Sequence, residues 1–137
     1  MARLLSIDYG RKRTGLAVTD PLQIIATPLT TVPTHQLLSY LTTYCQQEEV
    51  EAFVLGYPTQ LDGRDTDTTA AVKVLARQLE KKFAEKPVHL HDERFTTQLA
   101  LEAMITGGTS KKYRRQKGNL DKISATIILQ SYLAANS

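Results

Sequence analysis

The sequence contains a single cysteine, Cys45, and no long hydrophobic run. One cysteine cannot build a disulfide framework within the chain, so we expect an intracellular, cytoplasmic location. No stretch approaches the roughly 18 consecutive apolar residues of a membrane span. Arg3 introduces a charge too early for a secretory signal peptide. We therefore expect a protein that neither spans a membrane nor enters the secretory pathway.

Several enzyme signatures are also missing. The glycines of Gly10-x-x-x-x-Gly15 are not followed by the Lys-Ser/Thr pair of a P-loop, and no Gly-x-Ser-x-Gly motif of serine hydrolases occurs. His89 and His91 share one face of an expected strand, but no cysteine lies near them and a third ligand at zinc-site spacing is missing, so we expect packing or, for His91, a supporting role beside the site. A strand followed by Asp-x-Gly, as at Asp8, also occurs in sugar kinases and actin. Those proteins bind ATP between two such domains, and 137 residues supply only one.

The positive charge of the chain is concentrated in one short segment. The net charge is +3, and residues 107–119 contain no acid. The cations of that segment are Lys111, Lys112, Arg114, Arg115 and Lys117. Without these five, the rest of the chain has a net charge of −2. Clustered cations on a near-neutral body indicate binding to an anionic polymer such as nucleic acid.

Two further features bear on this prediction. Tyr113 lies among the cations and offers a flat ring on which an unpaired base can stack. A second, smaller basic cluster occurs at residues 11–13, Arg-Lys-Arg. Glycines flank the longer segment, so a merely solvated loop remains the alternative. We predict nucleic-acid contacts from Arg11, Lys12, Lys111, Lys112, Tyr113, Arg114, Arg115 and Lys117.

Apolar periodicity predicts strands and helices in alternation. Short apolar runs predict strands at residues 3–8, 14–19, 24–32, 51–55 and 87–91. Pro28 in the third of these favours an edge strand or a bulge. Helical spacing predicts helices at residues 37–45, 72–83, 96–107 and 120–135. Cys45 falls on the apolar stripe of the first helix, where we expect a buried thiol, and Ile123, Ile127 and Ile128 mark the last helix.

The order of these elements predicts the fold class. Three early strands with short connections favour antiparallel pairing, and the later alternation of strands and helices favours parallel pairing. We expect one α/β domain over residues 1–137. Its mixed five-stranded sheet has three N-terminal antiparallel strands, then parallel ones, and is flanked by helices.

Three acidic residues occupy positions that favour chemistry. Asp8 ends the first strand, Glu93 follows the last strand, and Asp121 opens the last helix. Ligands of open α/β sheets gather at the carboxyl ends of strands, where these residues can converge. A divalent cation relieves the repulsion among close carboxylates, and Mg²⁺ prefers one or two of them together with water and substrate phosphate. Asp8, Glu93 and Asp121 are therefore the candidate ligands of Mg²⁺ or Mn²⁺ and the candidate catalytic residues.

Each of these residues also has a structural explanation. Asp8 before Tyr9-Gly10 can shape a turn, and Asp121 can complement the dipole of its helix. Asp92 and Glu93 are neighbours, and alternation along a strand would point them to opposite faces. The pattern alone leaves open which of the two faces the site.

Four blocks of the sequence resemble the YqgF/RuvX family. They are SIDYGRKRTGLAV at 6–18, LGYPTQLDG at 55–63, HLHDERFTT at 89–97 and KGNLDKISATIIL at 117–129. The resemblance covers essentially the whole chain, in the right order and at the right separations. It implies a ribonuclease-H-like fold, with Asp8, Glu93 and Asp121 at the acidic positions of the family.

The resemblance also implies a function. Family members are assigned either to 5′-end processing of pre-16S rRNA or to resolution of Holliday junctions. We therefore expect a metal-dependent nuclease acting on structured nucleic acid, with pre-16S rRNA, alone or in the precursor of the small ribosomal subunit, favoured over branched DNA. The rival interpretation is a non-catalytic nucleic-acid-binding factor of ribosome assembly that has kept the carboxylates.

Overall fold

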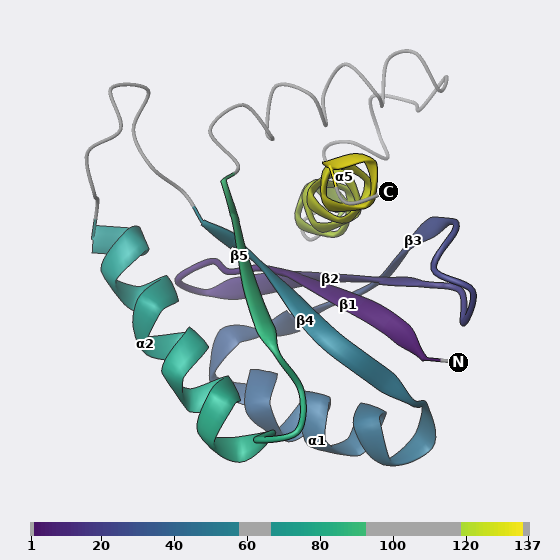
Figure 1. Cartoon of the computed structure of the whole chain (residues 1–137). Coiled ribbons are helices and arrows are strands. Elements are labelled where there is room, and N and C mark those ends of the chain that lie inside the picture. Colours follow the sequence, from purple (N-terminus) through teal and green to yellow (C-terminus); the bar gives the residue numbers. More distant parts are fainter. Residues whose placement is uncertain (1, 58–66, 93–118, 136–137) are drawn as a thin grey trace.

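The computed structural model describes residues 2–57, 67–92 and 119–135, which include a five-stranded sheet (Figure 1). The strands are β1 (Arg3–Asp8), β2 (Arg13–Thr19), β3 (Ala26–Pro33), β4 (Val50–Tyr57) and β5 (Val88–Asp92). Their order in the sheet is β3-β2-β1-β4-β5. β1 pairs antiparallel with β2, and β2 with β3, whereas β1–β4 and β4–β5 are parallel. The predicted mixed sheet is confirmed.

Helices cover both faces of this sheet. The described helices are the 3-10 turn η1 (Thr34–Gln36), α1 (Leu37–Gln47), α2 (Asp67–Lys82) and α5 (Asn119–Ala135). Figure 1 shows α1 and α2 on one face and α5 on the other. In this part of the chain, no helix is both long and apolar enough to cross a membrane. The helix predicted at 96–107 lies outside the described residues.

Strand alternation divides the core into two layers. In β1, Leu5 and Ile7 belong to the cluster that α1 and α2 cover, whereas Leu4 belongs to the cluster under α5. Ser6 is fully buried on the α5 side, where its hydroxyl donates a hydrogen bond of 2.6 Å to the carbonyl of Ala125. Successive side chains of a strand point to opposite faces. β1 therefore contributes to both cores and fixes which residues face α5.

The third strand confirms the interpretation of Pro28. β3 lies at the edge of the sheet, where a residue without an N–H costs no internal ladder bond. The register with β2 shifts between Leu16, which pairs with Thr30, and Ala17, which pairs with Pro28. Both expected features are present: β3 is an edge strand, and it contains an irregularity in register next to Pro28.

The buried face of α5 includes only one of the three isoleucines that mark the helix in the sequence, Ile128. Ala125, Ile128 and Leu129 are fully buried, whereas Ile123 and Ile127 are only half-buried. The small side chain of Ala125 lets the helix approach the sheet closely enough for its carbonyl to reach Ser6. The stripe of α5 that faces the sheet therefore combines the small Ala125 with the large Ile128 and Leu129. Cys45 is likewise half-buried rather than buried.

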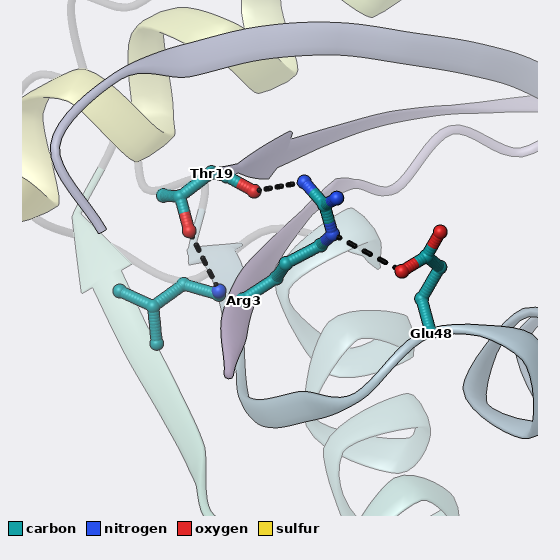
Figure 2. Close-up of polar contacts among 4 residues, drawn as sticks. Arg3, Thr19 and Glu48 are labelled. Carbon is teal, nitrogen blue, oxygen red and sulfur yellow. Dashed lines mark hydrogen bonds and ion pairs between the residues drawn. The ribbon is translucent and has the colours of Figure 1, made fainter. Parts of the chain in front are cut away.

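The start of β1 is tied to its neighbours by polar contacts (Figure 2). The guanidinium of Arg3 donates to the carbonyl of Thr19 at 2.9 Å and lies 3.5 Å from the carboxylate of Glu48. The hydroxyl of Thr19 accepts from the backbone N–H of Leu4 at 2.9 Å. These bonds link the beginning of β1 to the end of β2 and to the segment that precedes β4.

Ser6→Ala should lower the free energy of unfolding by about 1 kcal/mol, because it removes a buried hydrogen bond between two distant elements. For a domain of this size, that corresponds to a fall in Tm of about 4 °C. Thr42→Ala is the matched control, since it removes a hydroxyl bond of 2.8 Å to Leu38 within one turn of α1. Alanine has the higher helix propensity, so this variant should melt at or above wild type. Equal melting of Ser6→Ala and wild type would show that the bond contributes nothing.

Candidate active site at the carboxyl edge of the sheet

The carboxyl ends of three parallel strands meet at one edge of the sheet. Asp8, the last residue of β1, pairs with Gly15 of β2. In the parallel ladders, Ile7 pairs with Leu55, and Gly56 pairs with His91. One further step along the β1–β4 register puts Asp8 beside Gly56. A row at this edge therefore reads Gly15, Asp8, Gly56 and His91 across β2, β1, β4 and β5.

Alternation puts Asp8 on the α5 face. Ser6, two residues earlier, bonds to α5, while Tyr9, the next residue, packs against the opposite cluster. The neighbours of Asp8 in the row are glycines, which carry no side chain to cover it. Asp8 is half-buried and so keeps access to solvent. The edge thus presents a half-buried carboxylate between two glycines on the face that α5 covers.

The backbone of Asp121 lies close to the same part of the sheet. Asp121 is in the first turn of α5, four residues and about 6 Å along the helix from Ala125. Asp8 is two residues, or about 6.6 Å, along β1 from Ser6. The hydrogen bond between Ser6 and Ala125 joins β1 to α5. The backbones of Asp8 and Asp121 each lie only a few residues along the chain from this bond. Its position in the first helical turn also suits the alternative role of Asp121 with the helix dipole.

The remaining predicted site residues lie outside the described parts of the chain. Glu93 follows the last residue of β5, Asp92, and falls in the segment 93–118. The same segment contains Lys111, Lys112, Tyr113, Arg114, Arg115 and Lys117. Among the described residues there is no group of three or more His, Cys, Asp or Glu that could hold a metal ion. Of the three predicted acidic side chains, only that of Asp8 is described.

The short loop after β1 carries two of the predicted cations. Arg11 and Lys12 are exposed. Thr34 holds this loop through two hydrogen bonds. Its hydroxyl donates to the carbonyl of Gly10 at 2.6 Å, and its backbone N–H donates to the carbonyl of Lys12 at 2.9 Å. A Cβ on Gly10 would overlap the carbonyl of Arg13, so this position requires glycine. The loop therefore presents Arg11 and Lys12 from a fixed backbone beside Asp8.

The two histidines of β5 share the α5 face, as predicted. His91 Nε2 lies 2.8 Å from the Ser131 hydroxyl oxygen, and His89 and His91 both contact the ring of Tyr132. Their described contacts are those of packing and hydrogen bonding, which agrees with the expected role. Periodicity predicted that the two rings share a face; it could not predict that α5 is their partner.

Cys45 is poorly suited to act as a nucleophile at neutral pH. Burial raises the pKa of the Cys45 thiol above its ordinary value. The thiol is therefore protonated at pH 7, and only the thiolate is a good nucleophile.

In the β2–β3 turn, by contrast, the backbone N–H of Ile25, together with those of nearby residues, lowers the pKa of Asp20. That carboxylate stays charged, but it caps a turn at the opposite end of β2 from Gly15.

Comparison with known proteins decides the family. The model of the family described as "RuvX: Holliday junction resolvase" matches residues 2–135. The chain belongs to the RuvX family. A relative from Amoebophilus asiaticus is 51% identical over 135 residues, which are 98% of this chain and 96% of that protein. One from Phocaeicola vulgatus is 53% identical over 133 residues, 97% and 96% of the two chains. Both are named "Putative pre-16S rRNA nuclease".

Solved structures confirm the fold of this RuvX family member. RuvC of Thermus thermophilus in complex with a Holliday junction substrate superposes with a TM-score of 0.63 at 15% identity, covering 100% of this chain and 98% of that one. A second structure of T. thermophilus RuvC gives a TM-score of 0.56 at 15% identity, covering 98% and 96%. The predicted ribonuclease-H-like fold and the family resemblance are both confirmed. The names of family and relatives also agree with the predicted class, a hydrolase acting on phosphodiester bonds.

Gly10→Ala should disrupt the loop that carries Arg11 and Lys12. The added methyl group cannot fit against the Arg13 carbonyl, so the loop must shift and its two bonds to Thr34 must weaken. We expect a loss of about 1–3 kcal/mol of stability and faster hydrogen exchange at the Thr34 amide. Thr34→Val, which removes one of the two bonds, should show a smaller effect in the same direction. If Gly10→Ala melts and exchanges like wild type, the loop is not fixed as described.

Proposed function

We propose that the protein is a divalent-metal-dependent nuclease that hydrolyses phosphodiester bonds in structured nucleic acid, with pre-16S rRNA as its substrate. The observation that carries this proposal is Asp8. It ends the central strand at the carboxyl edge, faces α5 and is flanked by glycines. Family membership and the names of the relatives support the reaction class and favour the RNA substrate.

The donor set fits magnesium or manganese. Asp8, Glu93 and Asp121 supply carboxylate oxygens, the ligands that these hard cations prefer. In this proposal Asp8 and Asp121 hold the ions, and Glu93 either binds an ion or orients the attacking water. We choose Glu93 over Asp92 as the third carboxylate because Glu93 stands at the acidic position of the block HLHDERFTT, which resembles the family. The bound ions would activate water and stabilise the leaving oxygen of the cleaved phosphodiester.

Cations around this edge would hold the substrate backbone. Arg11 and Lys12 are exposed on the loop that follows Asp8, and Thr34 fixes the loop backbone. We assign phosphate contacts to these two and to Lys111, Lys112, Arg114, Arg115 and Lys117, with Tyr113 as a stacking platform for an unpaired base. Phosphate contacts carry little sequence information, so such a surface selects the shape of its substrate. A cytoplasmic location, where bacterial ribosomes are assembled, is part of the proposal.

A second candidate substrate is the Holliday junction. The description of the family and the RuvC complex favour it. A junction resolvase must cut two strands symmetrically, so this candidate requires a dimer in solution. Cleavage of pre-16S rRNA requires only one active site. A non-catalytic assembly factor, the third possibility, would bind either nucleic acid without cutting it.

Asp8→Asn should abolish cleavage while leaving the fold and most of the nucleic-acid affinity intact. The substitution preserves side-chain shape but removes a charge needed for metal binding, so the rate should fall by at least about a hundredfold. The assay compares pre-16S rRNA and a four-way DNA junction, side by side, in Mg²⁺ and Mn²⁺. Asp20→Asn is the matched control, because it makes the same change in the β2–β3 turn. It should cut at the wild-type rate.

The same variants test the metal site without an activity assay. Metal that binds only the folded protein stabilises it by about 2.7 kcal/mol at a concentration about 100 times the dissociation constant. Mg²⁺ or Mn²⁺ should therefore raise the Tm of wild type and of Asp20→Asn, and should raise that of Asp8→Asn much less. An Asp8→Asn protein that cuts at the wild-type rate and responds fully to metal would refute the site assignment. Binding by wild type without cleavage of either substrate would favour the assembly factor.

Replacing Lys111, Lys112, Arg114, Arg115 and Lys117 by Gln should weaken binding to all sequences alike. Each lost phosphate contact should flatten the log–log salt dependence of affinity by about 0.7 to 0.9. The measurement is a salt titration of binding to one RNA and to one unrelated sequence of equal length. An unchanged slope would mean that the segment is a solvated loop without substrate contacts.

A further inference from the structure

A pocket of about 500 Å³ lies on the face of the sheet opposite Asp8. Leu37 and Leu38 of α1 and Leu75 of α2 form part of its apolar wall. Val74 of α2 also lines it, although 51% of this residue is exposed. Nothing in the proposed cleavage chemistry accounts for this pocket or for an exposed valine beside it.

The pocket adjoins the carboxyl edge through Tyr9. Tyr9 follows Asp8 directly in the chain, lines the pocket, and packs against the cluster under α1 and α2. Asp8 and Tyr9 thus lie at the same end of β1 on opposite faces of the sheet. A residue that lines the pocket is therefore the immediate neighbour, along β1, of the carboxylate proposed for catalysis.

Cations lie next to the same pocket. Thr34 lines it, and Thr34 is also the residue that bonds the carbonyls of Gly10 and Lys12. The exposed Arg11 and Lys12 are therefore carried on a loop attached directly to the pocket wall. Such an arrangement suits a ligand with one flat apolar part and a phosphate on either side.

We propose that this pocket binds an unpaired nucleobase of the substrate strand, with the flanking phosphates held by Arg11 and Lys12. The proposal rests on the nuclease function proposed above and adds a binding site to it. Tyr9 provides an aromatic ring, Leu38 and Val74 provide apolar surface, and the side chains of Gln78 and His35 line the same pocket and can hydrogen-bond base edges. Its volume is within the range of small-ligand sites.

The adjacent charge favours a nucleotide over a protein side chain as the occupant. An apolar side chain of a partner protein would use the leucines and Val74 but would gain nothing from the neighbouring Arg11 and Lys12, whereas a nucleotide would use both. Every base has a flat face that can stack, so a pocket of this kind selects for an unpaired base without selecting its identity. The substrate would then be distinguished by an unpaired nucleotide near the cleavage position.

The test fills the pocket from its exposed side. Val74→Trp places a large ring at the mouth and changes no charge, and its control Thr43→Trp adds the same ring to an exposed position of α1 outside the pocket. Both are made in the Asp8→Asn background, so that bound RNA is not cut. The probe is a short RNA duplex with one single-nucleotide bulge, compared with the same duplex carrying an abasic residue at the bulge. Gln78→Ala, at an exposed side chain, is a second variant that cannot overfill the pocket.

We expect Val74→Trp to bind the intact RNA about tenfold more weakly than the control. The abasic bulge should weaken binding to the control protein by a similar factor and leave binding to Val74→Trp unchanged. Gln78→Ala should show a smaller loss of the same kind. Equal affinity of both tryptophan variants for intact RNA, or equal sensitivity of both to the abasic bulge, would overturn the pocket assignment. Cleavage by the protein with an intact Asp8 would then still support the nuclease, whereas absence of all RNA binding and cleavage would refute the nuclease itself.

Discussion

The position of every residue at the proposed site depends on the strand β1, which lies in the middle of the sheet and is buried on both faces. Leu5 and Ile7 fill one core, and Leu4 and Ser6 fill the other. A shift of β1 by one residue would exchange the two sets and put a serine and a carboxylate into the larger core. Burial on both faces therefore fixes the directions in which Asp8 and Tyr9 point.

The fixed orientation of β1 puts the two proposed kinds of substrate contact on opposite faces of the sheet. The α5 face carries the acidic residue proposed for chemistry, and the opposite face carries the apolar pocket proposed for a base. The loop at residues 10–12 runs between them and is attached to β3 and η1 through Thr34. Cations on this loop can contact a phosphate from either side of the edge. The sheet edge itself thus separates the negatively charged site from the apolar one by the thickness of one strand.

Much of this arrangement follows from the sequence. Short apolar runs predicted the five strands of the described sheet, and helical spacing of apolar residues predicted the helices α1, α2 and α5. Pro28 indicated both the edge and the bulge, because proline cannot donate to an internal ladder. The buried face of α5 was predicted less well, since close packing on a sheet selects Ala125 over the larger Ile127. The partner of the histidines and the attachment of the loop to Thr34 depend on residues distant in the chain, which no local pattern reveals. The convergence of Asp8, Glu93 and Asp121 remains a prediction, because it involves side chains outside the described residues.

The hydrogen bond between Ser6 and Ala125 joins residues 119 positions apart. During synthesis, α5 can therefore cover its face of β1 only after almost the entire described chain has been made. The α1–α2 core, built from residues 5–79, can form much earlier. Domains that close through such long-range contacts fold slowly in that step. A nascent protein would thus have an ordered sheet with one bare face, and the proposed active site would be assembled only when α5 docks, which couples catalytic competence to the final stage of folding.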